Sequence, residues 1–202
     1  MIAVVDYGVG NLFSLKCSLN AIQEEAIITR KEEEIKAADH VILPGVGAFG
    51  DAVRKLRETG MFDVVKETAA SGTPILGICV GMQLLFERDL EFGTHEGLGL
   101  IPGTVDAIEP RIPDQFDVPH MGWNPLHYTK ECALFRGLPE QTCVYFVHSY
   151  AAFGCDAYVT AEAEYGIPLT AAVQNGNVYG TQFHPEKSGN AGLAILKNFC
   201  EL

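Results

Sequence analysis

Cys79 is the residue whose surroundings most clearly predict chemistry. It stands between Gly77 and Gly81, directly after the apolar run 74–76 and before the helix formers of 82–87. A strand that turns at once into a helix holds the corner residue in a strained backbone conformation, and glycines two positions away leave room for that turn. The pattern predicts a nucleophile elbow, with the Cys79 side chain at the carboxyl end of a buried strand.

This position would favour the thiolate form of Cys79. The unpaired N–H groups at the start of the following helix favour negative charge, and the thiolate is the nucleophilic form of cysteine. The backbone N–H of Val80 could hold the oxyanion of a tetrahedral intermediate. The competing interpretation is a small buried cysteine beside packing glycines.

A cysteine nucleophile needs a base, and His184 offers one near the end of the chain. It follows the strand-like run 178–181 and is followed by Pro185 and Glu186. His184 would take the proton of the thiol and return it to a leaving amine, while Glu186 would orient the imidazole. Alone, these residues also fit a turn made by Pro185 with a solvated glutamate. Together with the elbow they predict a Cys-His-Glu triad.

Several motifs carry a resemblance to a known family. The stretches 77–83 and 183–188 resemble those of class I (triad) glutamine amidotransferases. More narrowly, Asp6–Leu12, Leu43–Phe49 and Pro119–Asn124 resemble the glutaminase subunits of imidazole glycerol phosphate synthase. These motifs extend from the first predicted strand to the region before the last predicted helix.

The resemblance implies that the protein hydrolyses L-glutamine to glutamate and ammonia through a thioester on Cys79. His184 would be the general acid and base, and Glu186 its orienting partner. The oxyanion would be held by Val80 and by the loop Gly45, Val46 and Gly47, whose glycines would let a peptide plane turn over when the synthase is engaged. The resemblance places five residues around the glutamine: Gln83, Glu91, His148, Ser149 and Tyr150. Plainer interpretations also exist, since Glu91 fits a solvated acid and the run His148, Ser149 and Tyr150 fits the end of an apolar strand.

The resemblance also implies a partner. In the family the glutaminase docks on a (β/α)8-barrel cyclase, and ammonia passes through that barrel to a ribulosyl phosphate, giving imidazole glycerol phosphate and AICAR in histidine biosynthesis. The matching positions near that interface are Pro119, His120, Met121, Trp123 and Lys187. Exposed Trp and Met are typical interface anchors, although core packing is the competing explanation for Met121 and Trp123.

Composition narrows the possible function classes. The chain has 202 residues, 48% of them hydrophobic and 20% charged, which is typical of one large globular domain over 1–202. A formal net charge of -12 disfavours nucleic-acid binding. No apolar run is long enough for a membrane span and no leader is recognisable, so we expect a cytoplasmic protein. The six cysteines lack metal-ligand spacing, and no metal or organic cofactor is implied.

The coarse element pattern predicts an α/β fold. Strand-like runs 2–5, 26–28 and 41–43 alternate with helical stretches in the first half, the first of them capped by Asn11, which predicts a mostly parallel central sheet flanked by helices. The second half adds mainly antiparallel strands, and Asn175-Gly176-Asn177 predicts a hairpin. The predicted elements of this second half are strands at 103–108, 144–147, 158–161 and 170–173 and a closing helix through 193–199.

Two other functions stay open at this point. The same elbow would serve a glutaminase of another synthase, such as one that aminates a sugar or a vitamin precursor; the motifs at 8–11 and 119–124 argue against it. The chain could also be a non-catalytic regulatory subunit with a decayed site, which the intact Cys79, His184 and Glu186 oppose.

Overall fold

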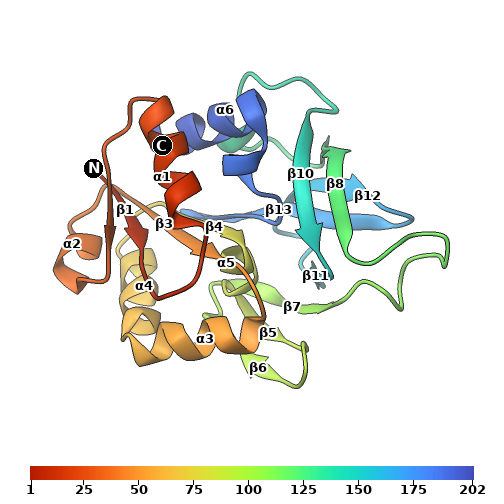
Figure 1. Cartoon of the computed structure of the whole chain (residues 1–202), viewed down its shortest axis with the longest axis horizontal. Coiled ribbons are helices and arrows are strands. Elements are labelled where there is room, and N and C mark those ends of the chain that lie inside the picture. The colour runs from red at the N-terminus through yellow and green to blue at the C-terminus, as the bar shows by residue number, and fades with distance from the viewer.

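A central sheet of eight strands organises the fold in the computed structural model, which describes residues 1–202 (Figure 1). The first five strands across the sheet are parallel, and the last three pair antiparallel. In spatial order the strands are β2 (Ala26–Thr29), β1 (Ile2–Val5), β3 (His40–Gly45), β4 (Ile75–Cys79), β14 (Val178–Thr181), β13 (Pro168–Asn175), β12 (Val159–Glu164) and β9 (His127–Tyr128).

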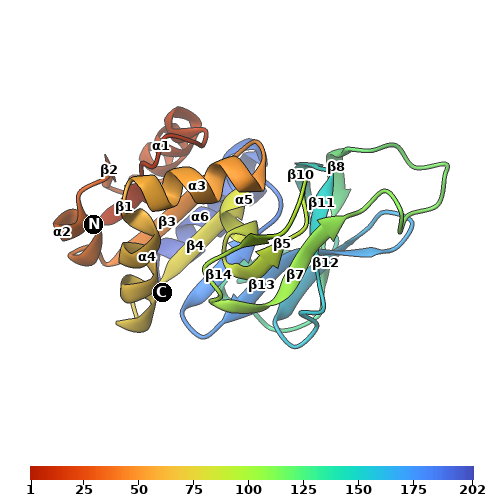
Figure 2. The same ribbon diagram turned by 90° about the horizontal axis from the view of Figure 1, so that it is seen from below.

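Helices cover both faces of the parallel half. In Figure 1, α1 (Leu12–Ala21) and α6 (Gly189–Cys200) lie above the sheet, with α3 (Phe49–Glu58) and α4 (Met61–Ala70) below it. Figure 2 shows α3 and α4 from their own side. Because both faces are covered, every residue of β1, β3 and β4 is buried, as expected for strands in the middle of a parallel sheet.

Local sequence signals explain how several elements begin. The side chain of Asn11 accepts a hydrogen bond from the N–H of Ser14 at 3.3 Å and caps α1. The short helix α2 (Glu32–Lys36) opens with three glutamates, which its N-terminus favours. Asn175 pairs with Val178, so β13 and β14 form the predicted hairpin with a two-residue turn.

Two smaller sheets complete the second half. One has β11 (Tyr150–Phe153), β7 (Ile101–Ala107), β5 (Phe86–Asp89) and β6 (His95–Glu96). The other pairs β10 (Cys143–His148) with β8 (His120–Pro125), and two 3-10 turns, η1 (Ala133–Phe135) and η2 (Pro185–Lys187), complete the chain. The predicted α/β fold with added antiparallel strands is confirmed, and none of the helices combines the length and apolar character of a membrane span.

The helix expected after Cys79 is much shorter than predicted. Helix α5 covers only Val80–Gln83, and the chain then enters strand β5 at Phe86, which pairs with Ile101 of β7. Sheet pairing therefore overrides the helical propensity of residues 82–87. Where the chain turns back into β5, Leu84, Leu85 and Phe86 are fully buried.

The glycines on either side of Cys79 are required by close backbone packing. A Cβ on Gly81 would lie 1.9 Å from the carbonyl oxygen of Leu43 in β3. A Cβ on Gly77 would lie 2.6 Å from the carbonyl oxygen of Gly81. Both distances are far inside van der Waals contact, so α5 rests directly on the backbones of β3 and β4. The elbow pattern thus has the steric cause that the sequence suggested.

We predict that Gly81→Ala destabilises the protein by at least about 3 kcal/mol, because neither contacting backbone can move without disturbing the sheet. Urea unfolding followed by circular dichroism measures this. The control is Gly137→Ala, whose Cβ would meet open space at a φ of +76°, so that only backbone strain of about 1 kcal/mol is expected. Equal losses in the two variants would contradict the packing explanation.

Candidate active site

Cys79 ends the central strand β4 in a backbone conformation that few residues adopt. Its φ is 55° and its ψ is -113°, and it is the residue immediately before α5. The side chain is largely buried, with 5% of the residue exposed. On one side Cys79 is in register with Gly45 of β3, and on the other side β4 pairs with β14. The carboxyl ends of these parallel strands therefore meet around the sulfur.

His184 reaches the same place from β14. Its Nδ1 lies 2.8 Å from Glu186 Oε1, and the exposed fractions of the two side chains are only 2% and 4%. Burial lowers the pKa of His184, but hydrogen bonds with Cys79 and Glu186 outweigh it and raise the pKa to about 9. The site is therefore suited to a protonated His184, with the carboxylate stabilising the imidazolium charge.

The turn that carries Glu186 is fastened to β10. The N–H of His184 donates to the carbonyl oxygen of Tyr145 at 3.0 Å, and the N–H of Tyr145 donates to Ser188 Oγ at the same distance. Ser188 Oγ in turn donates to the carbonyl oxygen of His184 at 2.6 Å. Between these anchors the 3-10 turn η2 brings Glu186 back beneath the imidazole.

A pocket of about 610 Å³ opens beside Cys79. Most of the predicted site residues share its wall, and Phe92 and Val147 are additions that sequence reasoning missed. Gly45, in register with Cys79, lines a small neighbouring cleft instead, as Glu186 also does. The pocket is lined by Val46, Gly47, Cys79, Val80, Gln83, Glu91, Phe92, Pro119, Val147, His148, Ser149, Tyr150, His184 and Lys187. As expected, the apolar strand β10 ends at His148, and Ser149 separates it from β11, which begins at Tyr150 in another sheet.

Glu91 and Gln83 are held more firmly than the sequence suggested. Glu91 Oε2 accepts a hydrogen bond from the N–H of Phe49 at 2.6 Å, so the carboxylate caps α3 at the pocket wall rather than lying free in solvent. Gln83 is 5% exposed, and its Nε2 donates to the carbonyl oxygen of Tyr150 and to Gln182 Oε1. Both residues therefore hold neighbouring parts of the pocket wall in place, and both also line the pocket.

The site combines a strained cysteine, a buried histidine and a glutamate. A known protein family also matches nearly the whole chain. Residues 3–202 match the family described as glutamine amidotransferase class-I. The chain belongs to this family. It is therefore an enzyme of the glutamine amidotransferase type.

Individual relatives of the chain have a more specific name than the family. The chain is 52% identical to "Imidazole glycerol phosphate synthase subunit HisH" of Sulfurimonas denitrificans, covering 98% of this chain and 97% of the relative. It is 47% identical to the protein of the same name from Oceanobacillus iheyensis, covering 100% and 99%.

Solved structures show the same fold for the amidotransferase. A structure described as glutamine amidotransferase superposes with a TM-score of 0.77 at 20% identity, covering 100% of this chain and 98% of the other. PurLQS from Thermotoga maritima gives a TM-score of 0.74 at 20% identity, with 99% and 97% covered. At this level of identity the likeness concerns the fold alone.

His120 lies elsewhere than the sequence suggested. It was expected near a partner surface, but it is 2% exposed and its ring stacks on Phe146 at 4.7 Å between centroids. Its Nδ1 lies 2.9 Å from Nε2 of His148, which is also buried. The alternation of side chains along β8 explains the difference, because His120 points inward where Met121 points outward. A partner can contact Met121 but not His120.

Met121 and Trp123 form an exposed face beside the pocket. They are 63% and 57% exposed, which excludes the core-packing explanation. Tyr145 lies opposite Trp123 in the β8–β10 pair, with ring centroids 6.2 Å apart, and Lys187 Nζ lies 5.9 Å from the centre of the Tyr145 ring. Sequence reasoning missed Tyr145, although its alternate position along β10 is a usable signal. Since Lys187 and the exposed Pro119 also line the pocket, this face continues to the pocket mouth.

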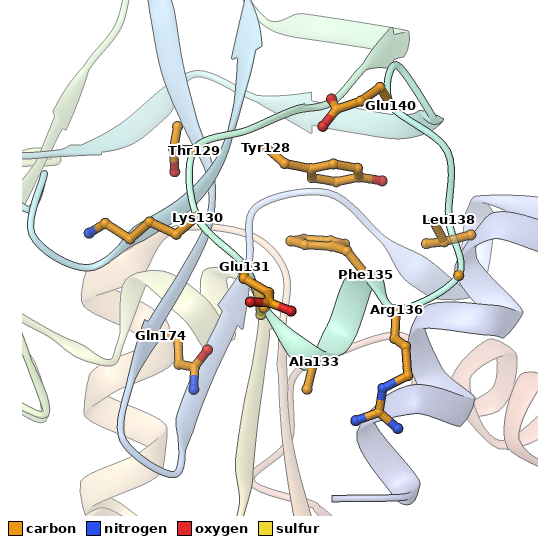
Figure 3. Close-up of a pocket in the computed structure, with 12 residues that line it drawn as sticks. Tyr128, Thr129, Lys130, Glu131, Ala133, Phe135, Arg136, Leu138, Glu140 and Gln174 are labelled. Atoms are coloured by element: carbon orange, nitrogen blue, oxygen red, sulfur yellow. The ribbon is translucent and has the colours of Figure 1, made fainter.

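A larger hollow of about 850 Å³ lies around the β9–β10 connection (Figure 3). Tyr128 and Phe135 stack there with centroids 4.8 Å apart, and Lys130, Glu131 and Arg136 lie around them. It also holds Cys132, but burial raises the pKa of that thiol and no histidine lines the hollow. Unlike the pocket at Cys79, it pairs no nucleophile with a base. No group of side chains in the amidotransferase is arranged to hold a metal ion.

Burial of the two neighbouring imidazoles predicts sensitivity to acid. Burial lowers the pKa of His120 from 6.5 to about 4 and that of His148 from 6.5 to about 3. The unfolded chain therefore takes up protons near pH 6.5 that the folded chain does not. The unfolding free energy should fall as pH drops below 6.5, by up to about 1.4 kcal/mol per pH unit for each imidazole.

Urea unfolding between pH 5.5 and 7 measures this slope. His120→Asn removes one titrating group but keeps a donor close to the Nδ1 position, so the slope should become shallower. His127→Asn, at an exposed position, is the matched control. An unchanged slope in His120→Asn would show that His120 is protonated in the folded state at these pH values.

Proposed function

We propose that the protein is the glutaminase subunit of an imidazole glycerol phosphate synthase. In this assignment it hydrolyses L-glutamine and passes ammonia to a cyclase subunit for imidazole glycerol phosphate and AICAR formation in histidine biosynthesis. The observation that carries the proposal is the buried set of Cys79, His184 and Glu186, of which Cys79 and His184 line a pocket of about 610 Å³. Full-length relatives that bear the HisH name support the choice of synthase.

The proposed chemistry has two steps. The thiolate of Cys79 attacks the side-chain amide carbon of glutamine, and the imidazolium of His184 gives its proton to the departing ammonia, which leaves a thioester on the sulfur. His184, now neutral, takes a proton from water as the water attacks the thioester. The intermediate then expels the thiolate, which restores the starting pair of thiolate and imidazolium, and the new carboxyl group of glutamate loses its proton to solvent. Glu186 holds the ring orientation through both steps.

The oxyanion of each tetrahedral intermediate needs two donors. The N–H of Val80 directly follows the nucleophile at the start of α5 and is the first of them. The second comes from the loop Gly45–Gly47, where Val46 is 38% exposed and Gly47 has a φ of +86°. Tyr7 donates to the carbonyl oxygen of Pro44 at 2.7 Å and holds the start of this loop. We assign to the loop a change of peptide orientation on engagement of the partner.

The pocket wall would bind the rest of glutamine. Glu91 supplies a carboxylate for the α-ammonium group, and the backbone around Ser149 and Tyr150 supplies polar contacts beside His148. Gln83 contributes mainly by holding the carbonyl oxygen of Tyr150 in place. In this proposal the carboxylate that caps α3 also faces the substrate, so substrate binding and the position of α3 are linked.

The proposed partner is a (β/α)8-barrel cyclase, docked on the exposed face of Met121, Trp123, Tyr145 and Lys187. One methionine and two aromatic side chains with a cation at the edge suit a protein interface. A net charge of -12 would steer a partner with a basic face toward the protein. The cytoplasmic location expected from the sequence stays a prediction.

Glutamate release by the purified protein tests the proposal, first alone and then with a cyclase barrel and its substrate. A large rise in the complex supports a gated glutaminase of this synthase. Full activity without the cyclase would support the triad but contradict the proposed change of orientation in the loop Gly45–Gly47. Activation only by an unrelated synthase would favour the other-synthase alternative. Silence in all mixtures would favour the non-catalytic subunit.

Substitutions in the triad should have graded effects. We expect Cys79→Ala to abolish glutamate release, and Glu186→Ala to lower it about 100-fold or more while leaving it measurable, because the orienting residue is the lesser member of such triads. The measurement is the steady-state rate in the complex at saturating glutamine. Equal residual rates in the two variants would contradict the orienting role of Glu186.

Removing the exposed indole should weaken complex formation without unfolding the protein. We expect Trp123→Ala to raise the Kd for the cyclase at least about 10-fold, because an anchor of this kind contributes disproportionately to affinity. Lys197→Ala, at an exposed position on α6, is the control. Titration calorimetry gives both values, and thermal melts of the free protein show that it is still folded. An unchanged Kd would move the interface elsewhere.

A further inference from the structure

Gln182 is buried against the sulfur of Cys79. The residue is 0% exposed, and its Nε2 lies 3.7 Å from Sγ, within hydrogen-bond distance for sulfur. It sits two positions before His184, in the bend that follows β14, and both side chains reach Cys79. An amide N–H aimed at a thiolate stabilises its charge, most strongly where water is excluded.

We propose that Gln182 is a further catalytic residue, which donates a hydrogen bond to the thiolate of Cys79 and is held in that orientation by a hydrogen-bond chain that runs from Asn124 through two buried imidazoles. The proposal rests on the proposed role of Cys79 as nucleophile. It adds a donor to the sulfur that is independent of His184 and of the backbone N–H groups of α5.

The orientation of the Gln182 amide follows from its neighbour Gln83. Gln83 Nε2 has two hydrogens, and it donates to Gln182 Oε1 at 3.1 Å and to the carbonyl oxygen of Tyr150 at 3.2 Å. Gln182 must therefore turn its oxygen toward Gln83 and its nitrogen toward the sulfur. The flipped amide would set two donors against each other at Gln83 and place an oxygen lone pair against a thiolate.

The carbonyl oxygen of Tyr150 joins this pair to two imidazoles. It also lies 2.8 Å from Nδ1 of His148, which must carry the proton because a carbonyl only accepts. Nε2 of neutral His148 is then an acceptor, and His120 Nδ1 donates to it at 2.9 Å. His120 Nε2 is left as an acceptor. Each imidazole thus has a single tautomer.

Asn124 closes the chain on β8. Its Nδ2 donates to His120 Nε2 at 3.2 Å and to the carbonyl oxygen of Glu164 at 2.9 Å. Every donor and acceptor of the chain is therefore assigned. The carbonyl oxygen of Tyr150 accepts from His148 on one side and from Gln83 on the other, and from Gln83 onward each amide donates toward the sulfur. Burial supports this arrangement, because it lowers the pKa of both imidazoles far enough to keep them neutral near pH 7.

The chain begins one residue from the exposed face. Asn124 follows Trp123 on β8, and His120 precedes Met121. The strand β8 therefore carries both the exposed side chains and two members of the hydrogen-bond chain. A shift of β8 would therefore alter the support of Gln182. The other titratable groups that interact with the sulfur are His184 and Tyr7, with His148 behind His184, and substitution of Gln182 changes the charge of none of them.

The test is the pH profile of iodoacetamide alkylation at Cys79 in the full chain, followed by mass spectrometry of the Cys79 peptide. Gln182→Met keeps the size and removes the donor, and should move the alkylation midpoint up by about one pH unit or more, a loss of about 10- to 100-fold in rate at pH 7. Gln182→Glu should move it further by placing a carboxylate there. Gln174→Met on β13 is the matched control, expected to leave the profile unchanged.

Variants of His120 test whether the hydrogen-bond chain positions Gln182. His120→Leu removes the donor to His148 and should move the midpoint in the same direction as Gln182→Met, while His120→Asn restores a donor near the Nδ1 position and should return it toward that of the unchanged protein. A loss of packing alone would not be rescued in this way. If Gln182→Met does not fold, this pair carries the test.

Folded Gln182 variants with an unchanged profile would overturn the proposal, and so would equal midpoints for His120→Leu and His120→Asn. These outcomes differ from failure of the proposed function. The proposed function is contradicted if Cys79→Ala still releases glutamate. The role of Gln182 is contradicted if glutamate release depends on Cys79 but substitution of Gln182 leaves the alkylation profile unchanged.

Discussion

The contact between Gly81 and the carbonyl of Leu43 is the constraint on which the site depends. It lets the single turn of α5 rest directly on β3, and this forces Cys79 into a backbone with φ near 55°. The sulfur consequently stands at the strand end, beside N–H groups that have no partner within the turn. Any side chain at position 81 would lift α5 away and separate the sulfur from these groups.

The parallel pairing of β4 and β14 then decides what meets the sulfur. Because the two strands run the same way, the chain leaving β14 passes Cys79 and presents alternate residues to it, first Gln182 and then His184. A 3-10 turn is needed to bring Glu186 back to the imidazole, and the backbone of β10 holds that turn. A helix of only one turn has a small dipole, so side-chain donors matter more here than beside a long helix.

Charge is distributed unevenly among the buried imidazoles. His184 is stabilised as a cation by a carboxylate and the cysteine. Burial keeps His120 neutral, and burial together with repulsion from His120 and His184 keeps His148 neutral. A neutral His148 avoids a second positive charge beside His184. The same two neutral rings are buried behind the face of Met121 and Trp123, and His148 also lines the pocket.

The sequence by itself determined the features that depend on neighbours along the chain. These are the glycine-flanked elbow at Cys79, the spacing from His184 to Glu186, the Asn11 cap, the hairpin turn and the parallel first half of the sheet. Only the tertiary structure decided that α5 stops after one turn, that His120 is buried, that Glu91 caps α3, and that Gln182 faces the sulfur. These outcomes depend on sheet pairing and burial between residues far apart in sequence, which local propensity and spacing do not encode.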